Sequence, residues 1–251
     1  MNGVLHGKVA LVTGGSRGLG REMVLAFAHA GADVVISSRK LEACEDLADE
    51  VRHKTGRRAV AHACHVGQWA ALDELVDAAY DAFGAVDVLV NNAGMAPLYD
   101  SLGSVTEDLF DKVLAVNLKG PFRLTALVGE RMVASGAGSI VNVSSIAAVR
   151  PTAEDLPYAA AKAGLDVLTA GYARALGPQV RVNTLMAGPF FTDISKAWDR
   201  DAFDEYAMRF PLQRGGRPDE VVGAAMYLAS DASSFTTGSV LRVDGGSALV
   251  Y

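Results

Sequence analysis

The chain has 251 residues, half of them hydrophobic, and a formal net charge of −6 at pH 7. This length suits one α/β domain with a large core, and no Pro-, Ser- or charge-rich linker divides it, so we expect a single domain over residues 1–251. The acidic charge, with no basic stripe, argues against nucleic acid as a partner. The apolar runs are too short to cross a membrane, and residues 1–7 lack an export-signal pattern, so we expect a cytoplasmic protein without a membrane partner.

The chain contains two cysteines, Cys44 and Cys64. Their spacing matches no metal-binding or redox pattern, so we expect buried free thiols and no metal site. Two cysteines without such a pattern also suit a reducing compartment.

Short segments rich in β-branched residues alternate with longer segments of helical periodicity. The predicted strands are Lys8–Thr13, Asp33–Ser37, Ala59–Ala63, Val86–Asn91, Ser139–Val143, Val180–Asn183 and Val240–Val243. The predicted helices are Arg21–Ala30, Leu41–Lys54, Gln68–Phe83, Glu107–Ala134, Ala159–Leu176 and Glu220–Ala229. This alternation predicts a doubly wound α/β fold of the Rossmann type, with a parallel sheet and helices on both faces.

Ligands of such sheets bind beyond the carboxyl ends of the strands, where the strand order reverses. The chemically suggestive residues of this chain all follow predicted strands. They are the segment 14–20 after the first strand, Ser38-Arg39 after the second, 91–94 after the fourth and Ser144-Ser145 after the fifth. We therefore expect one site at this edge of the sheet.

The first of these segments reads Gly14-x-x-x-Gly18-x-Gly20 and lies between a strand and a helix. Such a turn lets backbone N–H groups and the helix dipole face a pyrophosphate, although a glycine-rich turn can also be only a tight connection. On the dinucleotide interpretation, the predicted contacts from this turn are Gly14, Ser16, Arg17, Gly18, Leu19 and Gly20.

The residue about twenty positions beyond the glycines indicates the cofactor. An NAD-preferring site places Asp or Glu there, whereas this chain has Ser38 followed by Arg39. Arg39, with Arg17 from the glycine turn, can bind a 2′-phosphate through charge-assisted hydrogen bonds. We predict a preference for NADP(H), with NAD(H) still possible; the alternative is that both arginines are solvated surface residues.

Three polar residues indicate hydride-transfer chemistry. Tyr158 and Lys162 share one helix face, where an ammonium can favour the ionised phenol, and Ser145 precedes the tyrosine by thirteen residues. Tyr158 can protonate an alkoxide or deprotonate an alcohol, while Ser145 donates a hydrogen bond to the reacting oxygen. Taken singly, each has an ordinary structural interpretation as a core tyrosine, a turn serine or a solvated lysine.

Together these residues resemble the short-chain dehydrogenase/reductase family, in its oxidoreductase form of about 250 residues. The resemblance spans nearly the whole chain. It rests on Thr13-Gly14-x-x-x-Gly18-x-Gly20, Asn91-Asn92-Ala93-Gly94, Asn117, Ser145, Tyr158-x-x-x-Lys162, Gly188 with Thr192, and Val243-Asp244-Gly245-Gly246. It implies a seven-stranded sheet in the order 3-2-1-4-5-6-7.

The resemblance also implies the roles of individual residues. Asn117, Ser145, Tyr158 and Lys162 would form a catalytic tetrad, in which Asn117 holds a water that relays protons through Lys162. Without the resemblance, Asn117 reads as a residue on a helix surface. The further cofactor contacts that it implies are Asn92, Ala93 and Gly94 near adenosine, Gly188, Phe190 and Thr192 near the carboxamide, and Tyr158 and Lys162 at the ribose.

The chain departs from the family pattern at two places. His65-Val66 follows the third strand where many members have Asp, so we expect His65 either to contact adenine or to be an ordinary loop histidine. Ala187-Gly188-Pro189 stands where the family usually has Pro-Gly, which can alter the loop that contacts the carboxamide. Neither departure touches the tetrad.

Residues from about 189 to 212 correspond to the substrate lid of this family. Their aromatic and apolar side chains would either cover an apolar carbonyl compound or only pack the lid onto the body or a neighbouring subunit. The side chains are Phe190, Phe191, Ile194, Trp198, Phe203, Tyr206, Met208 and Phe210. The substrate itself is not indicated.

Three alternatives to a generic carbonyl reductase stay open. A 3-oxoacyl-carrier-protein reductase is disfavoured because the segments 135–139 and 177–179 lack the arginines that meet an acidic carrier. A glucose-type sugar dehydrogenase fits the same motifs. A catalytically silent NADP-binding sensor is disfavoured by the intact tetrad. The resemblance further implies a homotetramer built on the helices at 107–134 and 159–176.

Overall fold

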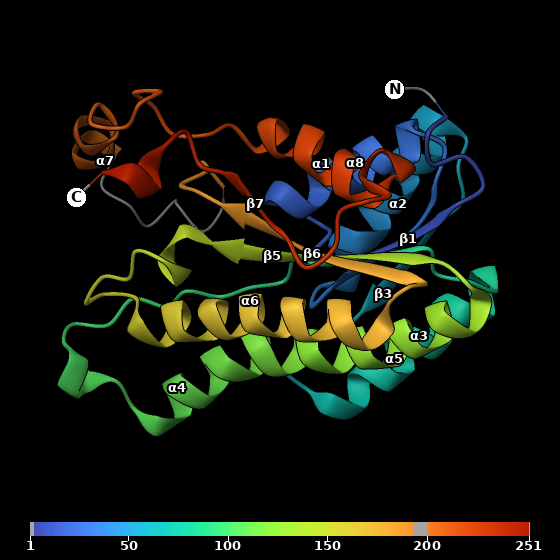
Figure 1. Cartoon of the computed structure of the whole chain (residues 1–251), viewed down its shortest axis with the longest axis horizontal. Helices are drawn as coiled ribbons and strands as arrows, with labels where there is room; N and C mark the ends of the chain where they lie inside the picture. The colour runs from blue at the N-terminus through green and yellow to red at the C-terminus, as the bar shows by residue number, and fades with distance from the viewer. Residues whose placement is uncertain (1–2, 193–199, 251) are drawn as a thin grey trace.

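The computed structural model describes residues 3–192 and 200–250, which build one seven-stranded parallel sheet in the order β3-β2-β1-β4-β5-β6-β7 (Figure 1). The strands are β1 (Val9–Thr13), β2 (Asp33–Ser38), β3 (Ala59–Ala63), β4 (Val88–Asn91), β5 (Gly138–Ser145), β6 (Val180–Ala187) and β7 (Val240–Val243). This confirms the predicted strand order. β5 and β6 run further than predicted, so that Ser144 and Ser145 are the last residues of β5.

The helices that the structure describes alternate with these strands. They are α1 (Gly18–His29), α2 (Leu41–Thr55), α3 (Trp69–Phe83), α4 (Glu107–Leu114), α5 (Gly120–Ser135), α6 (Leu156–Leu176), α7 (Arg200–Ala207) and α8 (Val222–Ala229). The predicted helix 107–134 is in fact α4 and α5 joined by a π-helical turn at Ala115–Lys119. The α7 helix was not predicted.

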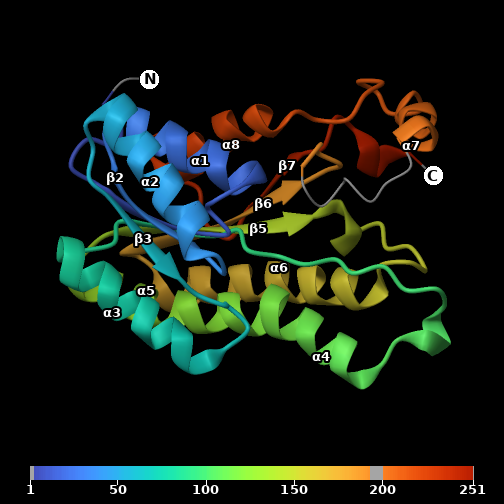
Figure 2. The same ribbon diagram turned by 180° about the vertical axis from the view of Figure 1, so that it is seen from behind.

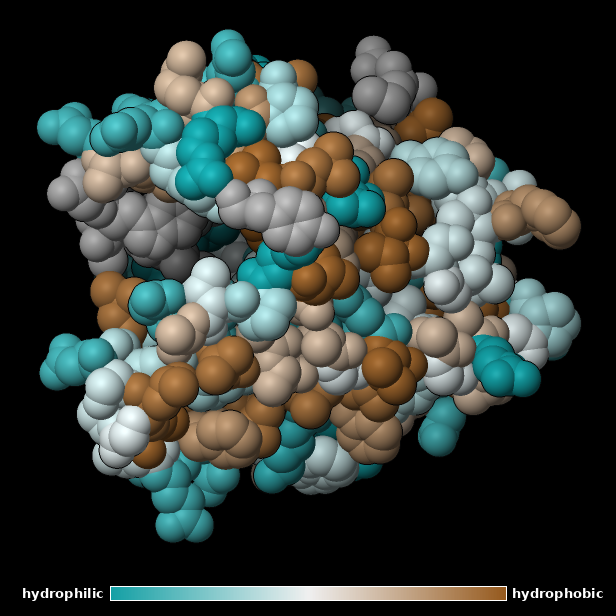
Figure 3. All heavy atoms as spheres, turned by 60° about the vertical axis from the view of Figure 1, so that its left-hand side comes forward, coloured by the Kyte–Doolittle hydropathy of each residue, from teal (hydrophilic) through white to brown (hydrophobic). Residues whose placement is uncertain are grey.

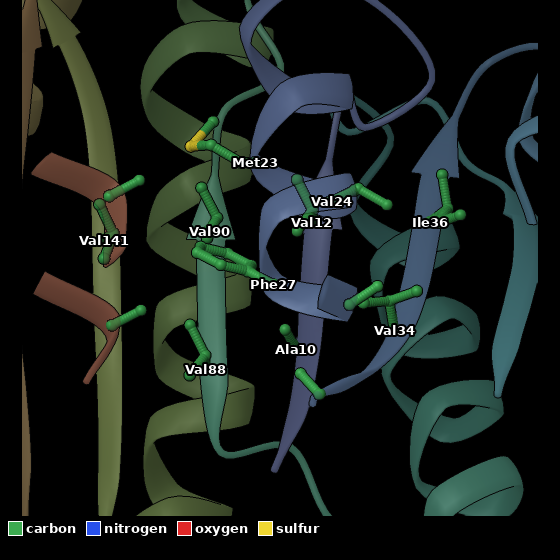
Figure 4. Close-up of a cluster of buried hydrophobic side chains, with 14 of the residues drawn as sticks. Ala10, Val12, Met23, Val24, Phe27, Val34, Ile36, Val88, Val90 and Val141 are labelled. Atoms are coloured by element: carbon green, nitrogen blue, oxygen red, sulfur yellow. The ribbon is translucent and has the colours of Figure 1, made fainter. Parts of the chain in front are cut away.

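Helices cover both faces of the sheet, as the two opposite views show (Figures 1 and 2). The helices α1, α2 and α8 lie on one face, and α3, α5 and α6 lie on the other. Successive residues of a strand point to opposite faces, so Val34 and Ile36 pack with α1 and Phe27 (Figure 4), while Val35 joins the cluster of α3 and α5. Two apolar cores therefore hold the sheet rigid and its carboxyl edge in place.

Among the residues described, no helix has the length and hydrophobicity to span a bilayer. This part of the chain also brings together no group of three or more His, Cys, Asp or Glu side chains that could hold a metal ion. Cys44 and Cys64 are buried free thiols, as predicted.

Candidate functional site

The turn between β1 and α1 has a backbone that only glycine suits. Gly14 has φ +61° and Gly18 has φ +53°, both in the left-handed region. A Cβ atom on Gly14 would lie 2.9 Å from the Cα atom of Ala93, and one on Gly20 would overlap the carbonyl oxygen of Gly14. The turn therefore packs closely against the backbone of neighbouring residues and brings its chain directly into the start of α1 at Gly18.

A hydrogen-bond network joins this turn to the end of β4. The Thr13 hydroxyl accepts from the backbone N–H groups of Asn92 and Ala93, at 3.1 and 3.2 Å, and donates to the carbonyl of Val90 at 3.2 Å. The side-chain amide of Asn92 donates to the carbonyls of Thr13 and Gly14, at 3.0 and 3.1 Å. Thr13 and Asn92 thus fix the spacing of the two loops. Sequence reasoning placed Thr13 in the motif and assigned it no role.

Ser38 is the last residue of β2 and contacts the glycine turn directly. The Ser16 hydroxyl donates to the Ser38 hydroxyl at 3.0 Å, and Cys44 Sγ lies 3.0 Å from the same oxygen. The neighbouring Arg17 and Arg39 are both exposed. Two hydroxyls in contact and two exposed arginine residues therefore lie at the ends of β1 and β2, a set of residues that suits an anion.

His65 lies in the loop after β3 and hydrogen bonds within its own turn. Its Nδ1 atom accepts from the N–H of Gly67 at 3.1 Å, and its side chain is half-buried. Val66 is buried, and its carbonyl lies so close to Gly120 that a Cβ there would overlap it. The contact of His65 and Val66 with adenine stays a prediction, because the observed bond explains the histidine without it.

The structure brings Ser145, Tyr158 and Lys162 together at the junction of β5 and α6. The Ser145 hydroxyl accepts from the N–H of Ala147 at 3.2 Å, and Ser145 lies near enough to Tyr158 to lower the pKa of its phenol. The Lys162 ammonium donates to the carbonyl of Val143 at 2.8 Å and lies 5.6 Å from the centre of the Tyr158 ring. A phenol, a hydroxyl and an ammonium therefore lie near one another, and their roles stay predictions.

Burial controls the protonation of this group. It lowers the pKa of Lys162, which is 3% exposed, to about 8, while the carboxylate of Asp166 opposes that shift. Burial also raises the pKa of Tyr158, and Asp155 adds to this effect, while the hydrogen bond from Ser145 lowers it. In the protein alone burial therefore raises the pKa of the Tyr158 phenol, and the expected effect of Lys162 on that phenol stays a prediction.

Asn117 is fully buried, so its interpretation as a helix surface residue is wrong. It lies in the π-helical turn, where its amide donates to the carbonyls of Met95 and Val113 at 2.8 and 2.9 Å and its oxygen accepts from the Met95 N–H at 3.2 Å. A Cβ on Gly94 would lie 3.0 Å from Asn117 Oδ1 and 3.7 Å from Lys162 Nζ. Gly94 thus borders Asn117 and Lys162 at once.

The loop after β6 closes the other end of the site. A Cβ on Gly188 would collide with the backbone of Asp244, which explains a glycine there. Ala187 ends β6 and pairs with Val243, so the departure at this position leaves the strand intact. Phe190 is buried and pairs with Gly216. A Cβ on Gly18 would lie 3.4 Å from Cβ of Thr192, so this loop reaches the glycine turn.

The described aromatic residues of the lid segment pack mainly on one another. The ring of Phe203 lies edge-on to Phe191 and Phe210, at 5.1 and 6.4 Å between centroids, and Tyr206 lies 5.0 Å from Phe210. Phe210 is 2% exposed, whereas Tyr206 and Met208 are 45% and 57% exposed. Ile194 and Trp198 lie outside the described residues.

This end of the molecule, viewed in Figure 3, mixes hydrophobic and hydrophilic side chains. The view brings forward the side of Figure 1 on which α7 and the C-terminus lie. The packing among Phe191, Phe203 and Phe210 supports the structural interpretation of those aromatics, and the exposed faces of Tyr206 and Met208 leave the substrate interpretation open for them.

Comparison with known proteins identifies the family. A family model described as enoyl-(acyl carrier protein) reductase matches residues 14–248. The chain is 36% identical over 244 residues to a 3-oxoacyl-[acyl-carrier-protein] reductase of Thermotoga maritima, covering 96% of this chain and 98% of the relative. It is 37% identical over 244 residues to a D-threitol dehydrogenase of Mycolicibacterium smegmatis, covering 96% and 93%.

The fold comparison agrees. The structure of a gluconate 5-dehydrogenase from Burkholderia cenocepacia, in complex with NADP and tartrate, matches with a TM-score of 0.93 and 34% identity. The match covers 98% of this chain and 97% of that one. With its sheet order, its full-length relatives and its matching family model, the chain belongs to the short-chain dehydrogenase/reductase family.

Proposed function

We propose that this protein is an NADP(H)-dependent oxidoreductase that interconverts a carbonyl compound and a secondary alcohol. The observation that carries the proposal is the meeting of Asn117 and Lys162 at Gly94, with the Tyr158 ring 5.6 Å from the Lys162 ammonium and Ser145 at the end of β5. A polar group of this kind, at the carboxyl edge of a parallel sheet and next to a glycine turn, suits hydride-transfer chemistry.

The residues fit a nicotinamide dinucleotide. Gly14 and Gly20 admit no Cβ, and α1 begins between them at Gly18, so backbone N–H groups at its start can face a pyrophosphate. The nicotinamide ring supplies or accepts the hydride when bound. The residues that we propose hold the cofactor are Gly14, Ser16, Arg17, Gly18, Leu19, Gly20, Ser38, Arg39, His65, Val66, Asn92, Ala93, Gly94, Tyr158, Lys162, Gly188, Phe190 and Thr192.

In the reductive direction, Tyr158 donates its proton to the substrate oxygen as negative charge develops there. The raised pKa of Tyr158 keeps the phenol protonated at neutral pH, ready for this role. Ser145 donates a hydrogen bond to the same oxygen, and the Lys162 ammonium stabilises the phenolate left behind. Asn117, which is hydrogen bonded to Met95, lies in the π-helical turn near Lys162. It can position a water that returns a proton to Tyr158 through Lys162.

The preference for NADP(H) follows from the cations beside Ser38. Arg39 is exposed next to the Ser16–Ser38 hydrogen bond, where a 2′-phosphate would accept from its guanidinium. Losing such a charge-assisted bond weakens binding by about 1.5–3 kcal/mol, so Arg39→Ala should lower NADPH affinity roughly tenfold to a hundredfold. NADH affinity should stay unchanged. Arg131→Ala, whose side chain pairs with Asp77 elsewhere, is the matched control.

The substrate that we propose is a free small carbonyl compound or alcohol. Relatives include both a carrier-protein reductase and a threitol dehydrogenase, so the family alone does not choose. The segments 135–139 and 177–179 carry no cation, and the protein is itself acidic, which disfavours docking of an acidic carrier. A hydroxylated substrate of the sugar or polyol class stays the second candidate.

We further propose a single domain over residues 1–251 with a lid at about 189–212, working in the cytoplasm as a homotetramer. Apolar side chains exposed on the helices that the family pairs support the assembly: Phe110 and Phe122 are each 41% exposed, and Val167 is 73% exposed. Light scattering tests it, since a monomeric mass would contradict the assembly.

The test of the function is a coupled assay of NADPH and NADH oxidation at 340 nm across ketones, acyl thioesters and sugars, with alcohols assayed in reverse. Turnover by the wild type should fall about a thousandfold or more in Tyr158→Phe, which keeps the ring and loses the proton. Cofactor binding measured by fluorescence should survive in the variant. Tight binding without turnover of any substrate would favour the silent-sensor alternative.

A further inference from the structure

Asp166 lies on the same face of α6 as Tyr158 and Lys162. Tyr158, Lys162 and Asp166 follow one another at spacings of four, so their side chains occupy one helix face. The first two belong to the proposed tetrad. The third has no part in it, although it is partly buried on the helix that carries the site.

The face of α6 around Asp166 rests on a polar layer of the sheet. The Ser144 hydroxyl donates to the Lys162 carbonyl at 3.4 Å. One helical turn beyond Asp166, the Thr169 hydroxyl accepts from the side chains of Asn142 and Thr184, at 2.9 and 3.0 Å. Asp166 lies between these two groups of contacts, which connect β5 and β6 to the helix.

The Asp166 carboxylate is poorly satisfied where it lies. Its Oδ1 atom is buried without a hydrogen-bond partner. Burial raises the pKa of Asp166, and the nearby hydroxyls of Ser144 and Thr184, with the charge of Lys162, partly offset that shift. An uncompensated buried carboxylate oxygen destabilises a fold, so this position is unfavourable for packing alone.

The charged surroundings of Lys162 are otherwise sparse. From α6 it faces the Tyr158 ring, from β5 the carbonyl of Val143, and from the π-helical turn the neutral side chain of Asn117. Among the described residues, Asp166 is the acid that raises the pKa of Lys162 against burial. The two charges sit in a low-dielectric layer, where their attraction is stronger than in water.

We propose that Asp166 is a positioning residue that acts through Lys162 and keeps its ammonium protonated at neutral pH. The carboxylate needs no contact with substrate or cofactor. Its negative charge stabilises the Lys162 ammonium, which lies one helical turn away on the same face of α6. The inference rests on the proposed function for its catalytic consequence only. The protonation of Lys162 can be measured whether or not the protein turns over any substrate.

The direct test is a ¹³C NMR titration of protein labelled at lysine Cε, without cofactor, with the Lys162 signal assigned by its absence in Lys162→Arg. The wild-type midpoint should lie near pH 8. In Asp166→Asn it should move to lower pH by about one unit, and Asp166→Glu should restore it. An unchanged midpoint in a folded Asp166→Asn would overturn the proposal.

A merely structural role makes a different prediction. Thr169→Val disturbs the same polar layer without removing a charge, so it should lower the thermal midpoint and leave the Lys162 titration unchanged. Asp166→Ser, which also removes the charge, is the second variant should Asp166→Asn not fold. A shifted titration in Thr169→Val, equal to that of Asp166→Asn, would assign the effect to packing and refute the proposal.

Kinetics give the catalytic readout. With a substrate identified by the assay above, the alkaline limb of the kcat profile should move to lower pH in Asp166→Asn, with near-normal kcat recovered in acid. Asp166→Glu should keep the wild-type profile. If no substrate is found, the titration still decides the inference, so its failure is distinct from the failure of the proposed function.

Discussion

The proposed active site has a cofactor half around the glycine turn and a lid half in the segment at about 189–212. Different kinds of contact hold the described residues of each half in place. On the cofactor half, Gly14 and Gly20 allow almost no substitution, because a Cβ on either would collide with neighbouring backbone atoms. Hydrogen bonds between Thr13 and Asn92 hold the two loops together. On the lid half, aromatic edges pack loosely enough that Tyr206 and Met208 stay about half exposed. The backbone of the cofactor half is therefore fixed by close contacts, whereas Tyr206 and Met208 in the lid half keep exposed faces that a further molecule can contact.

The largest effect is expected on NADPH affinity, from a substitution in the glycine turn of the cofactor half. Gly14→Ala and Gly84→Ala both place a Cβ at positive φ, at +61° and +76°, but only the first Cβ meets other atoms, at 2.9 Å from Ala93 Cα. Both variants carry about 1 kcal/mol of strain. Gly14→Ala should in addition lower NADPH affinity about a thousandfold, roughly 4 kcal/mol, by calorimetry. Equal NADPH affinities in the two variants would contradict the close packing of the turn.

The next effect separates packing from substrate contact in the lid half. Phe210 is 2% exposed and touches Phe203 and Tyr206, so Phe210→Ala should lower the free energy of unfolding by about 3 kcal/mol. Tyr206→Ala, at the exposed edge of the same cluster, should cost less than half as much. Denaturant unfolding measures both. If instead Tyr206→Ala raises KM severalfold at unchanged stability, its exposed face contacts substrate.

A third effect concerns stability and pH. Burial lowers the pKa of Lys162 from 10.5 in the unfolded chain to about 8, so below pH 8 the folded state carries the full cost of a buried charge. Lys162→Met should therefore be inactive and more stable by about 2 kcal/mol at pH 7. As pH rises from 8 towards 10.5, the wild type gains stability and this advantage should shrink. A pH-independent difference in urea unfolding would contradict the assignment.

The smallest effect tests how the loop after β4 is joined to the start of α6. The Tyr99 hydroxyl donates to the carbonyl of Ala153 at 2.7 Å and accepts from the N–H of Leu156, the first residue of α6, at 3.0 Å. Tyr99→Phe keeps the ring and loses both bonds, each worth about 1 kcal/mol. We expect kcat/KM to fall threefold to tenfold with NADPH affinity unchanged. A wild-type value would show that the start of α6 is fixed without Tyr99.

The same contrast explains how far the sequence could predict the molecule. The strand positions and the residues of the turn were predictable because β-branched runs, the glycine spacing and the four-residue spacing of Tyr158 and Lys162 act locally, whereas the strand order was predicted only from the family resemblance. The burial of Asn117 was missed by periodicity, since the π-helical turn at 115–119 shifts the helix face by one residue.

The raised pKa of Tyr158 was missed for another reason. Spacing shows that a lysine is near, but desolvation depends on the whole surrounding fold. The position of Ser38 and Arg39 at the end of β2 was predictable because they follow a predicted strand, whereas α7 and the packing of Phe203 depend on contacts that no local pattern encodes. Local rules thus predicted the backbone elements around the glycine turn better than those of the lid segment.

The central claim is hydride transfer assisted by Tyr158. It is tested most directly by a single turnover with NADPH deuterated at C4 of the nicotinamide on either face, followed by mass spectrometry of the alcohol product. We expect deuterium on the carbinol carbon from one of the two labelled cofactors in the wild type, and almost no product in Tyr158→Phe. Product that carries no deuterium from either cofactor, or equal product from both proteins, would contradict it.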